Sequence, residues 1–462
     1  MSELPAVGRS ATRVLTVGRV LCAVPFLYLA SIAGYALLNF VDFAGAAPQF
    51  VRYIAAPLAL ACFFLWGAIS RGGARAAAIG AYGCAVLAGL FLHEAVATSR
   101  LTRSVSASLA SMHENTEATA VFRQTLPPGV TARGLAFEFD HNDLKTVLLG
   151  GIPFRETLLC SGDSDNLISY RADRFGFNNP DEVYSAGALD VAIFGDSFVE
   201  GMCLKPGDDV ATRVRSSLPR TASFGFRGAG PMMELAALGR FGPALRPKLS
   251  VVVYYAGNDW ENLEVELRQP WLRPALYGEA RFGEAGVTAS QIARAEEVVE
   301  KLWRDDAENL ERYRARVLRN FFALSQTWLT IGLHYPAAPK AQPEFETIVV
   351  RMRDLAASWG GEVLFIYVPR AERFRGGFDN DFVFDQARAP FFTAIEKAGV
   401  SAIDLVEHME TDADPISFFA QDGHFSAKGA NFLASLIIDY ADDRFDDVGE
   451  PELAVADADE EL

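Results

Sequence analysis

The sequence predicts an α/β fold, namely a three-layer α/β/α sandwich with a parallel sheet, preceded by three transmembrane helices. Two observations lead to this fold class. Three long, uncharged apolar runs follow one another within the first 97 residues. In the second half of the chain, short runs rich in β-branched and aromatic residues alternate with helical patterns. That alternation is typical of a parallel sheet covered by helices on both faces.

The three uncharged runs are each at least 18 residues long, about the length that a helix needs to cross roughly 30 Å of hydrocarbon. They are Val20–Val41, Tyr53–Ser70 and Ala76–His93. The alternative is a signal peptide followed by buried core helices. It is disfavoured because polar mature protein normally follows a signal peptide, whereas two more apolar runs follow here.

Basic residues flank these runs mainly on one side, which predicts the orientation of the chain. Cytoplasmic segments carry the excess of Arg and Lys, and the basic residues before the first run and after the second are Arg9, Arg13, Arg19, Arg71 and Arg75. The exception is Arg52 at the outer end of the second run, where a long side chain can reach the interface. We therefore expect a multi-pass membrane protein, with everything after about Ala97 outside the cytoplasm.

The rest of the chain divides by composition. Residues 441–462 hold ten acids against one base, which is −9 of the net charge of −17, and such a segment is expected to be solvated and disordered. The expected organisation is a membrane region (1–97), a stalk rich in Ser, Thr and Ala (98–130), an irregular β-rich lead-in (131–185), the α/β domain (186–440) with a helical insertion at about 260–343, and the acidic tail (441–462).

The insertion contains a predicted helix start, because Thr288 is a suitable N-cap and Gln291 three residues later completes a capping box. Two interpretations of the insertion stay open. It is either a lid or partner-docking surface, or extra packing beside the sheet.

Three buried strands are predicted in the α/β domain, at Val191–Phe194, Leu249–Tyr255 and Glu362–Val368. Unbroken β-branched and aromatic runs of this length are typical of strands covered on both faces. Helical patterns occupy Ala211–Leu218, Met232–Phe241, Ile348–Trp359, Ala387–Ala398 and Ala427–Tyr440. In parallel sheets the functional groups lie beyond the carboxyl ends of the strands, so the residues that follow each strand are the candidates for chemistry.

The first strand leads directly into Gly195-Asp196-Ser197. A serine between a buried strand and a helix is presented at the edge of the sheet, and its own N–H lies where it can stabilise an oxyanion. The pattern is not the G-x-S-x-G elbow of α/β-hydrolases. A second Gly-Asp-Ser ends at Ser164, but turn residues follow it, so Ser197 is the preferred nucleophile.

Two further segments of the α/β domain can supply hydrogen-bond donors for an oxyanion. Asn258 comes directly after the second strand, where its side chain can donate a hydrogen bond; a tight turn is the alternative interpretation. Between the two strands, the glycine-rich segment 223–231 lets backbone N–H groups approach a ligand. A phosphate-binding loop is excluded there because no Gly-Lys-Ser/Thr follows.

A serine nucleophile needs a base, and the base needs an orienting group. Asp422 and His424, on either side of a glycine, can supply both. His408 is the rival, but its surroundings predict a helix surface. No set of His, Cys and carboxylates has the spacing of metal ligands, so no metal or cofactor is expected. The absence of a basic stripe argues against nucleic acid as a partner.

Together these four segments resemble the SGNH hydrolase superfamily, also called GDSL esterases and lipases, over roughly residues 165–440. The resemblance implies Ser197 as nucleophile and Asp422 and His424 as the rest of a triad. It implies an oxyanion hole formed by the Ser197 N–H, Gly228 and Asn258, with Gly225 as the rival to Gly228.

The sequence departs from the pattern of this family at three places. Ala256 replaces the usual Gly two residues before the Asn, and Ser223 replaces the usual Asn of the Gly block. The Asp and His are two residues apart rather than three, a spacing that resembles the branch that acetylates alginate.

Two of the five cysteines, Cys160 and Cys203, lie outside the predicted spans. An oxidising compartment permits them to form a disulfide, and two buried free thiols are the alternative.

From the candidate triad and the predicted topology, the expected function is an extracytoplasmic serine esterase. Its expected substrate is an acylated small molecule or polysaccharide, either envelope carbohydrate or lipid esters. An O-acyltransferase and a non-catalytic envelope scaffold are the rival functions. The sequence does not identify a protein partner. The stretch Arg174–Pro180 and the two cysteines also resemble bacterial envelope members of this family, a resemblance that implies a location in the bacterial inner membrane.

Overall fold

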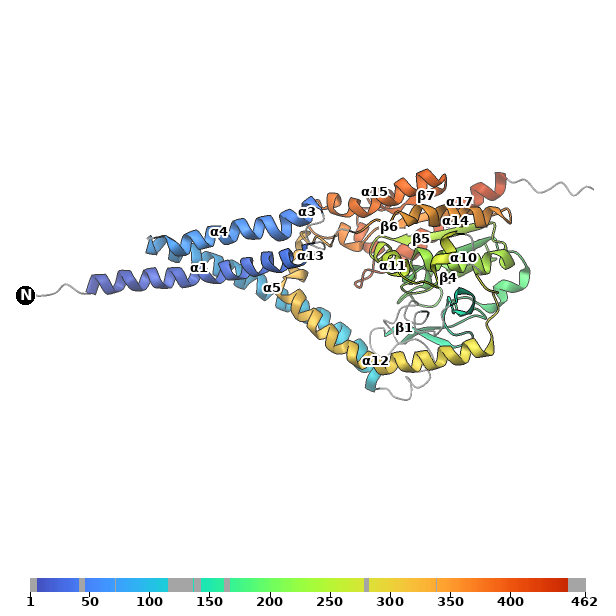
Figure 1. Cartoon of the computed structure of the whole chain (residues 1–462), viewed down its shortest axis with the longest axis horizontal. Helices are drawn as coiled ribbons and strands as arrows, with labels where there is room; N and C mark the ends of the chain where they lie inside the picture. Colours follow the sequence, from blue (N-terminus) through green and yellow to red (C-terminus); the bar gives the residue numbers. More distant parts are fainter. Residues whose placement is uncertain are drawn as a thin grey trace, which may run out of the picture.

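The computed structural model describes residues 6–40, 46–70, 72–114, 136, 143–161, 167–277, 282–337 and 339–447. A narrow bundle of long helices extends from one end of an α/β domain (Figure 1). The amino-terminal end of the chain lies at the far end of this bundle, and the carboxyl-terminal helix lies at the opposite end of the molecule.

The bundle consists of α1 (Ala6–Leu38), α4 (Ala56–Ile69) and α5 (Gly73–Glu114), with α3 (Ala47–Phe50) and the π-helical η1 (Val51–Ala55) leading into α4. Among the described residues, three helical segments are long and apolar enough to cross a membrane, in the region where the sequence predicts the spans: Val14–Leu38, Ala47–Ile69 and Gly73–Arg100. Glycines let α1 and α5 approach closely, as is usual in membrane bundles; a Cβ on Gly80 would lie 2.7 Å from the backbone N of Cys22.

The third span runs without a break into the predicted stalk, because α5 continues to Glu114. The rest of the stalk, after residue 114, lies outside the described residues. In the lead-in, β1 (Glu156–Ser161) and β2 (Leu167–Arg171) form an antiparallel pair, flanked by the short helices η2 (Leu144–Thr146) and η3 (Asp181–Ala186). Ser164, the second Gly-Asp-Ser serine, lies outside the described residues.

The predicted disulfide is present in the structure. Cys160 of β1 is bonded to Cys203, and their Cα atoms are 5.4 Å apart. The bond ties the lead-in to the turn that follows the Ser197 helix, so the lead-in is fixed to the α/β domain next to the predicted site.

The α/β domain is built on five parallel strands in the order β4-β3-β5-β6-β7. The strands are β3 (Val191–Gly195), β4 (Thr221–Gly225), β5 (Leu249–Tyr255), β6 (Glu362–Val368) and β7 (Ser401–Asp404). The fold-class prediction is confirmed, and β5 and β6 have the predicted bounds. Two strands, β4 and β7, were not predicted.

Alternate side chains of each strand point to opposite faces, so the sheet separates two cores. Phe194, Tyr254 and Phe365 belong to the core beneath α10 (Pro231–Leu245), α14 (Glu344–Ala357) and α15 (Asp381–Ala398). Ile193, Val253 and Ile366 belong to the core beneath α9 (Val210–Arg215), α16 (Leu405–Met409) and α17 (Ala427–Asp447). These two layers of helices complete the three-layer sandwich.

The boundary predicted for the acidic tail was wrong by seven residues. The last helix, α17, continues to Asp447, because Ala441 is buried in the second core and the Phe445 ring packs beneath the Lys248 ammonium, 4.9 Å away. The remainder of the tail, from residue 448, lies outside the described residues.

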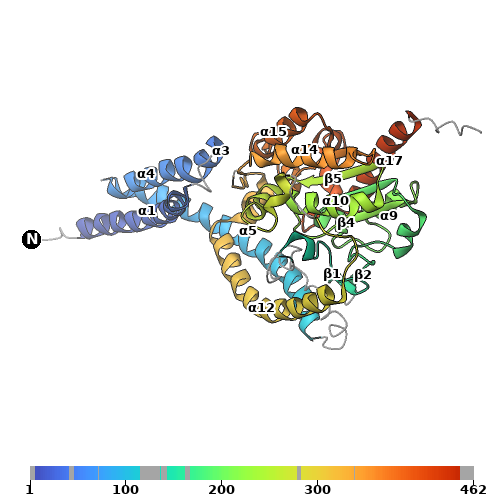
Figure 2. The ribbon, with the colours of Figure 1, turned by 45° about the vertical axis from the view of Figure 1, so that its right-hand side comes forward.

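The insertion contains α11 (Asp259–Glu266), η4 (Arg273–Tyr277), α12 (Ala289–Phe322) and α13 (Ser325–Ile331). The Thr288 N-cap and its capping box are present. Early residues of α12 pack on the core, as one interpretation predicted. The helix then runs beside α5 toward the bundle, and α13 packs against α5 (Figures 1 and 2). The insertion therefore joins the α/β domain to the bundle of apolar helices, which neither interpretation predicted.

Candidate active site

The chain order of the strands locates the candidate site. From β3 the chain moves outward to β4 and then returns to β5 on the other side of β3. In open parallel sheets, ligands bind at such a switch point, beyond the carboxyl ends of the two strands that diverge. Ser197 follows β3 and Asn258 follows β5, so both predicted residues lie at this point.

Ser197 is the first residue of α8 (Ser197–Glu200), and only 7% of its surface is exposed. The preceding residue, Asp196, is the N-cap. One carboxylate oxygen of Asp196, Oδ1, accepts a hydrogen bond from the Phe198 N–H at 3.0 Å. This cap fixes the turn between strand and helix. The Ser197 side chain is thereby held at the edge of the sheet, with its own N–H in the first turn of a helix.

The structure brings Ser197, His424 and Asp422 together. Ser197 Oγ is 2.9 Å from His424 Nε2, and His424 Nδ1 is 3.0 Å from Asp422 Oδ2. Since ionised Asp422 only accepts hydrogen bonds, Nδ1 carries the proton and Nε2 presents its lone pair to the serine hydroxyl. The other oxygen of Asp422 accepts the His424 backbone N–H at 3.1 Å, which orients the carboxylate toward the ring. His408, the rival histidine, is exposed on α16.

The charges of the pair support each other. Burial opposes ionisation of Asp422, but the hydrogen bond and charge of His424 outweigh it, and the pKa of Asp422 is lowered. Burial alone would lower the pKa of His424, yet the hydrogen bond and charge of Asp422 raise it above the ordinary value of 6.5. A more basic imidazole is a better acceptor for the serine proton.

Asn258 is held for donation by a buried carboxylate. Its Nδ2 group donates to Asp196 Oδ2 at 3.0 Å, and this leaves the second N–H of the amide for a ligand. Asp196 is fully buried; burial raises its pKa, and the hydrogen bonds from Phe198 and Asn258 oppose that rise. The alternative interpretation of Asn258 as only a turn residue does not account for this side-chain contact.

The backbone N–H of Gly228 is a better candidate for the third oxyanion donor than that of Gly225. The Gly225 N–H donates to Ser223 Oγ at 3.2 Å, so it is engaged inside the fold. Gly228 has a φ of +74°, in the left-handed region that favours glycine. Its N–H donates to no other described residue.

Comparison with known proteins gives structural relatives only. No family model matches the chain, and no curated protein matches it. The solved structures similar to it are named mainly as lipases, esterases and acylhydrolases, several of the G-D-S-L type.

Three of these structures illustrate the degree of similarity. The lipase/acylhydrolase from Enterococcus faecalis is 14% identical, with 55% of this chain and 96% of that chain covered and a TM-score of 0.31. A GDSL-like lipase from Bacteroides thetaiotaomicron is 11% identical, with 55% and 88% covered and a TM-score of 0.29. A two-domain esterase active on acetylated mannans is 12% identical, with 59% and 53% covered and a TM-score of 0.30. At this level the likeness carries no argument about activity, which has to come from the site itself.

A buried ion pair next to the site connects two of its segments. Sequence patterns did not indicate this pair. Glu200, the last residue of α8, is fully buried and pairs with Arg227. The Arg227 guanidinium donates to both Glu200 oxygens, at 2.7 and 2.9 Å, and the Arg227 backbone N–H donates to Glu200 at 2.8 Å. Tyr170 also donates to Glu200, at 3.1 Å. The pair therefore joins the Ser197 helix to the turn that carries Gly228.

Replacing Glu200 with alanine is expected to lower the free energy of unfolding by about 3–5 kcal/mol, because it leaves the Arg227 charge buried without a partner. Thermal unfolding of the detergent-solubilised protein, converted to free energy, measures the loss. The matched control is Glu264→Ala, which breaks the exposed pair with Arg268 and should cost less than about 1 kcal/mol. Equal effects of the two substitutions would contradict a supporting role for Glu200.

Two other carboxylates near the site, Asp259 and Glu266, accept hydrogen bonds from backbone N–H groups. Asp259, next to Asn258, is fully buried and accepts the Tyr255 N–H at 2.7 Å; burial raises its pKa well above the ordinary value. Glu266 accepts the N–H groups of Gly230 and Met232 at the start of α10. Among the described residues, no group of three or more His, Cys, Asp and Glu is arranged to hold a metal ion.

Proposed function

We propose that this chain is a membrane-anchored, extracytoplasmic serine ester hydrolase that works through an acyl-enzyme on Ser197. The observation that carries the proposal is the continuous hydrogen-bond chain from Ser197 Oγ through His424 to Asp422, with distances of 2.9 and 3.0 Å. These three groups, with Asn258 and two backbone donors nearby, form the arrangement needed for acyl transfer. The proposed substrates are esters of envelope carbohydrate or lipid.

In the first step, Ser197 Oγ attacks the ester carbonyl carbon while His424 Nε2 takes the hydroxyl proton. The carbonyl oxygen becomes an oxyanion, which the N–H groups of Ser197 and Gly228 and the Asn258 amide stabilise. The intermediate collapses by breaking the bond to the alcohol oxygen, which receives the proton from His424. The products of this step are the free alcohol and the acyl-Ser197 ester.

In the second step, His424 deprotonates a water molecule that attacks the acyl-Ser197 carbonyl. Breaking the bond to Ser197 Oγ, which regains a proton from His424, releases the carboxylic acid. If a sugar hydroxyl takes the place of water, the same steps make an O-acyltransferase, the activity suggested by the short Asp422–His424 spacing. Analysis of products formed with a polysaccharide acceptor separates hydrolysis from transfer.

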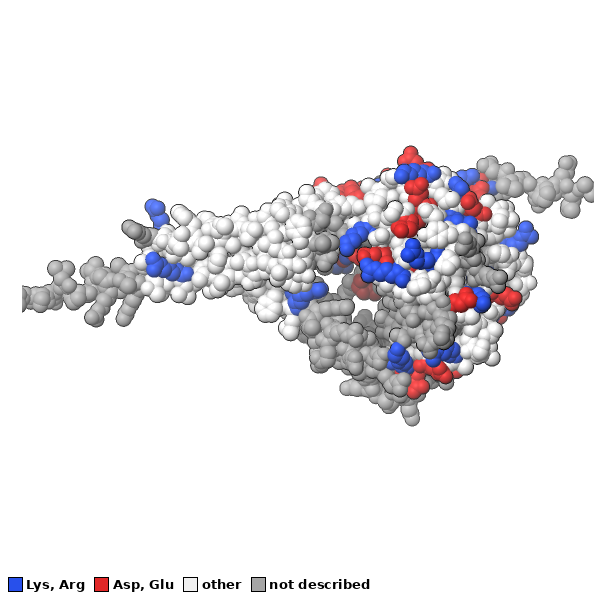
Figure 3. All heavy atoms as spheres, viewed as in Figure 1, with Lys and Arg blue, Asp and Glu red and all other residues white. Residues whose placement is uncertain are grey.

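The position of the domain supports the extracytoplasmic assignment. It lies at the end of the bundle where α1 ends and α4 starts, whereas Arg75, in the first turn of α5, lies at the other end. Figure 3 shows Lys and Arg side chains at the end of the bundle remote from the domain. Because basic connections stay in the cytoplasm, the domain belongs on the opposite side.

Labelling with a membrane-impermeant fluorophosphonate tests both the nucleophile and its location. Such a probe reacts with an activated serine, so intact spheroplasts that express the chain should be labelled, and the Ser197→Ala variant should not. Equal labelling of wild type and Ser197→Ala would refute the nucleophile. Labelling only after the membrane is permeabilised would refute the orientation.

The pH dependence of kcat/KM should report the titration of His424. Only the neutral imidazole accepts the serine proton, so activity is full above the pKa of His424 and is lost as the pH falls through it. Because Asp422 raises that pKa, the midpoint of the acid limb should lie above 6.5. The Asp422→Asn variant should move this midpoint downward. A wild-type midpoint at or below 6.5 would contradict the role assigned to Asp422.

A further inference from the structure

The joint between the α/β domain and the membrane bundle is formed by α13 and the segment after it. Glu94, near the outer end of the third span, is fully buried. Its carboxylate accepts hydrogen bonds from the N–H groups of Gln326 and Thr327, at 3.1 and 2.7 Å, and from the Thr327 hydroxyl at 2.9 Å. A buried carboxylate is costly unless it is hydrogen-bonded in this way, so the contact fixes α13 in one position on α5.

The other two spans hold the same segment. The Arg52 guanidinium lies 4.1 Å from the Trp328 ring, and its Nε donates to the Leu333 carbonyl at 3.2 Å. The Tyr28 hydroxyl, within the first span, donates to the Phe322 carbonyl at 3.0 Å. All three spans therefore contact residues 322–333, and the joint is a packed interface rather than a flexible linker.

The corner between α12 and α13 lies beside the apolar part of α5. The Phe91 ring of α5 contacts Phe321 and Phe322, with centroids 5.6 and 6.4 Å apart. On the outer side of the same corner, Leu318 and Phe322 are 61% and 59% exposed, one helical turn apart. Phe322 links this exposed apolar surface to Phe91 of the third span, so lipid is the medium that suits it.

A second exposed apolar group lies at the start of α15. Phe378 and Phe382 are 59% and 49% exposed. The Phe382 ring contacts the Tyr335 ring at 5.7 Å, and the Tyr335 carbonyl accepts a hydrogen bond from Tyr53 at the outer end of the second span. Both groups therefore border the outer ends of the spans, where aromatic side chains contact the headgroup region.

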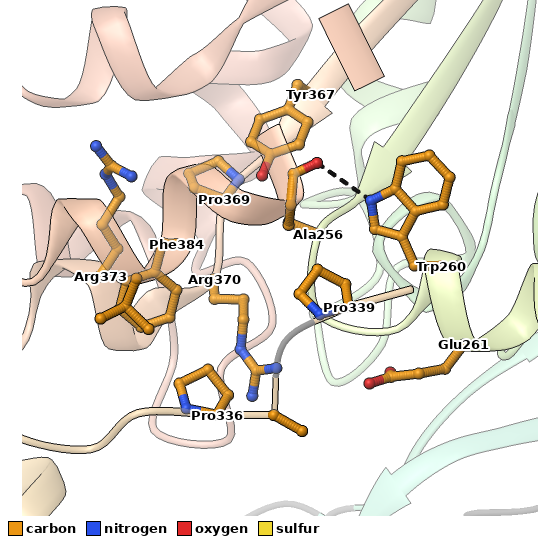
Figure 4. Close-up of a pocket in the computed structure, with 13 residues that line it drawn as sticks. Ala256, Trp260, Glu261, Pro336, Pro339, Tyr367, Pro369, Arg370, Arg373 and Phe384 are labelled. Atoms are coloured by element: carbon orange, nitrogen blue, oxygen red, sulfur yellow. Dashed lines mark hydrogen bonds between the residues drawn. The ribbon is translucent and has the colours of Figure 1, made fainter. Parts of the chain in front are cut away.

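The strands point their carboxyl ends toward this joint. Figure 4 shows Arg370, two residues after the end of β6, beside Pro336 and Pro339 of the segment that follows α13. The first residue of β6, Glu362, instead faces Arg444 near the end of α17, at 3.8 Å. That helix ends at the side of the molecule away from the bundle (Figure 1), so the carboxyl edge of the sheet faces the membrane helices.

The loop that carries the triad adjoins the same region. The Gln421 carbonyl, next to Asp422, accepts a hydrogen bond from Arg375 at 3.4 Å. Gly376 packs so closely on Gly332, at the end of α13, that a Cβ on Gly376 would lie 2.2 Å from the Gly332 backbone N. His424 is thus connected to the α13 joint through two short loop contacts.

We propose that residues 318–331 are seated in the outer leaflet and hold the catalytic edge of the sheet against the bilayer, so that the enzyme takes an amphiphilic ester from the membrane rather than a free ester from solution. This inference rests on the proposed serine esterase function and narrows its substrate class. Phe378 and Phe382 rest on the same lipid surface and keep the loop beside the triad at the bilayer.

The test uses the full chain in phosphatidylcholine vesicles with two esters that share one leaving group. Methylumbelliferyl acetate is supplied in solution, and methylumbelliferyl palmitate is embedded in the vesicles. The wild type should hydrolyse both. In the Phe378→Ser/Phe382→Ser variant, turnover of the embedded ester should fall by about tenfold or more, because the loop beside the triad is no longer kept at the bilayer, where that ester is concentrated. Turnover of the acetate should stay within about twofold, since both side chains are exposed.

Two further variants complete the experiment. Glu94→Ala removes the carboxylate that binds the first turn of α13. It should lower turnover of the embedded ester and leave turnover of the acetate unchanged, as in the double variant. Tyr277→Ser is the matched control, because Tyr277 is also an exposed aromatic residue but belongs to η4, which packs on α10 and α14; it should change neither rate. Should both rates fall together in the Phe378→Ser/Phe382→Ser variant, or the wild type cleave only the acetate, the membrane-facing inference is wrong. If the wild type hydrolyses neither ester, the proposed esterase function is wrong.

Discussion

Replacing His424 with alanine is expected to lower kcat for a soluble ester by about 10⁴- to 10⁶-fold, the range found when a serine triad loses one of its members. The reason is geometric. His424 Nε2 is 2.9 Å from Ser197 Oγ, while Asp422 reaches the serine only through the imidazole. Without the ring, the serine hydroxyl keeps its proton and attacks poorly. The measurement is steady-state hydrolysis of methylumbelliferyl acetate by the purified chain.

Two comparisons make this experiment specific. The Ser197→Ala/His424→Ala double variant should be no slower than either single variant, because the two groups act as one unit. His408→Ala, which removes the exposed histidine of α16, should leave kcat unchanged. A His424→Ala enzyme that retained activity within about tenfold of the wild type would exclude His424 as the general base.

The parts of the fold that sequence patterns predicted are those with a strong local signal. Runs such as Leu249–Tyr255 are apolar throughout, and β5 has those bounds. The missed strand β4 (Thr221–Gly225) contains Thr, Ser and two small residues, and it is a strand because it pairs with β3 along its whole length. The missed strand β7 has only four residues. Pairing with a neighbour, which no local pattern records, determines both of these strands.

The site shows the same division between local and tertiary information. Ser197, Asp422 and His424 stand in short motifs that make them candidates from the sequence alone, and their side chains lie within hydrogen-bond distance of one another in the fold. The contacts of Asp196 with Asn258 and of Glu200 with Arg227 join residues that are far apart in the chain. The Gly-Asp-Ser motif alone does not reveal which residues these acids contact in the fold. The docking of α13 on Glu94 was likewise hidden, because its donors and acceptor are more than 200 residues apart.

Replacing Asn258 with alanine should lower kcat by about 10²- to 10³-fold, the usual cost of losing one oxyanion donor. The loss should appear in kcat rather than KM, because the amide binds the charge that develops only in the transition state. Asp196 holds Nδ2 of Asn258 at 3.0 Å, and it is therefore a positioning residue. Asn258→Asp should be at least as slow, since it replaces the donor with a second carboxylate beside Asp196 and beside the developing oxyanion.

The control for this experiment must separate a lost donor from a disturbed turn. Asn320→Ala changes the same residue type on α12, away from the sheet, and it should leave kcat unchanged. The melting temperature of Asn258→Ala should stay near that of the wild type if the turn is intact. If Asn258→Ala raised KM and left kcat unchanged, Asn258 would contact the substrate equally in the ground and transition states. The oxyanion would then depend on the backbone N–H groups of Ser197 and Gly228 alone.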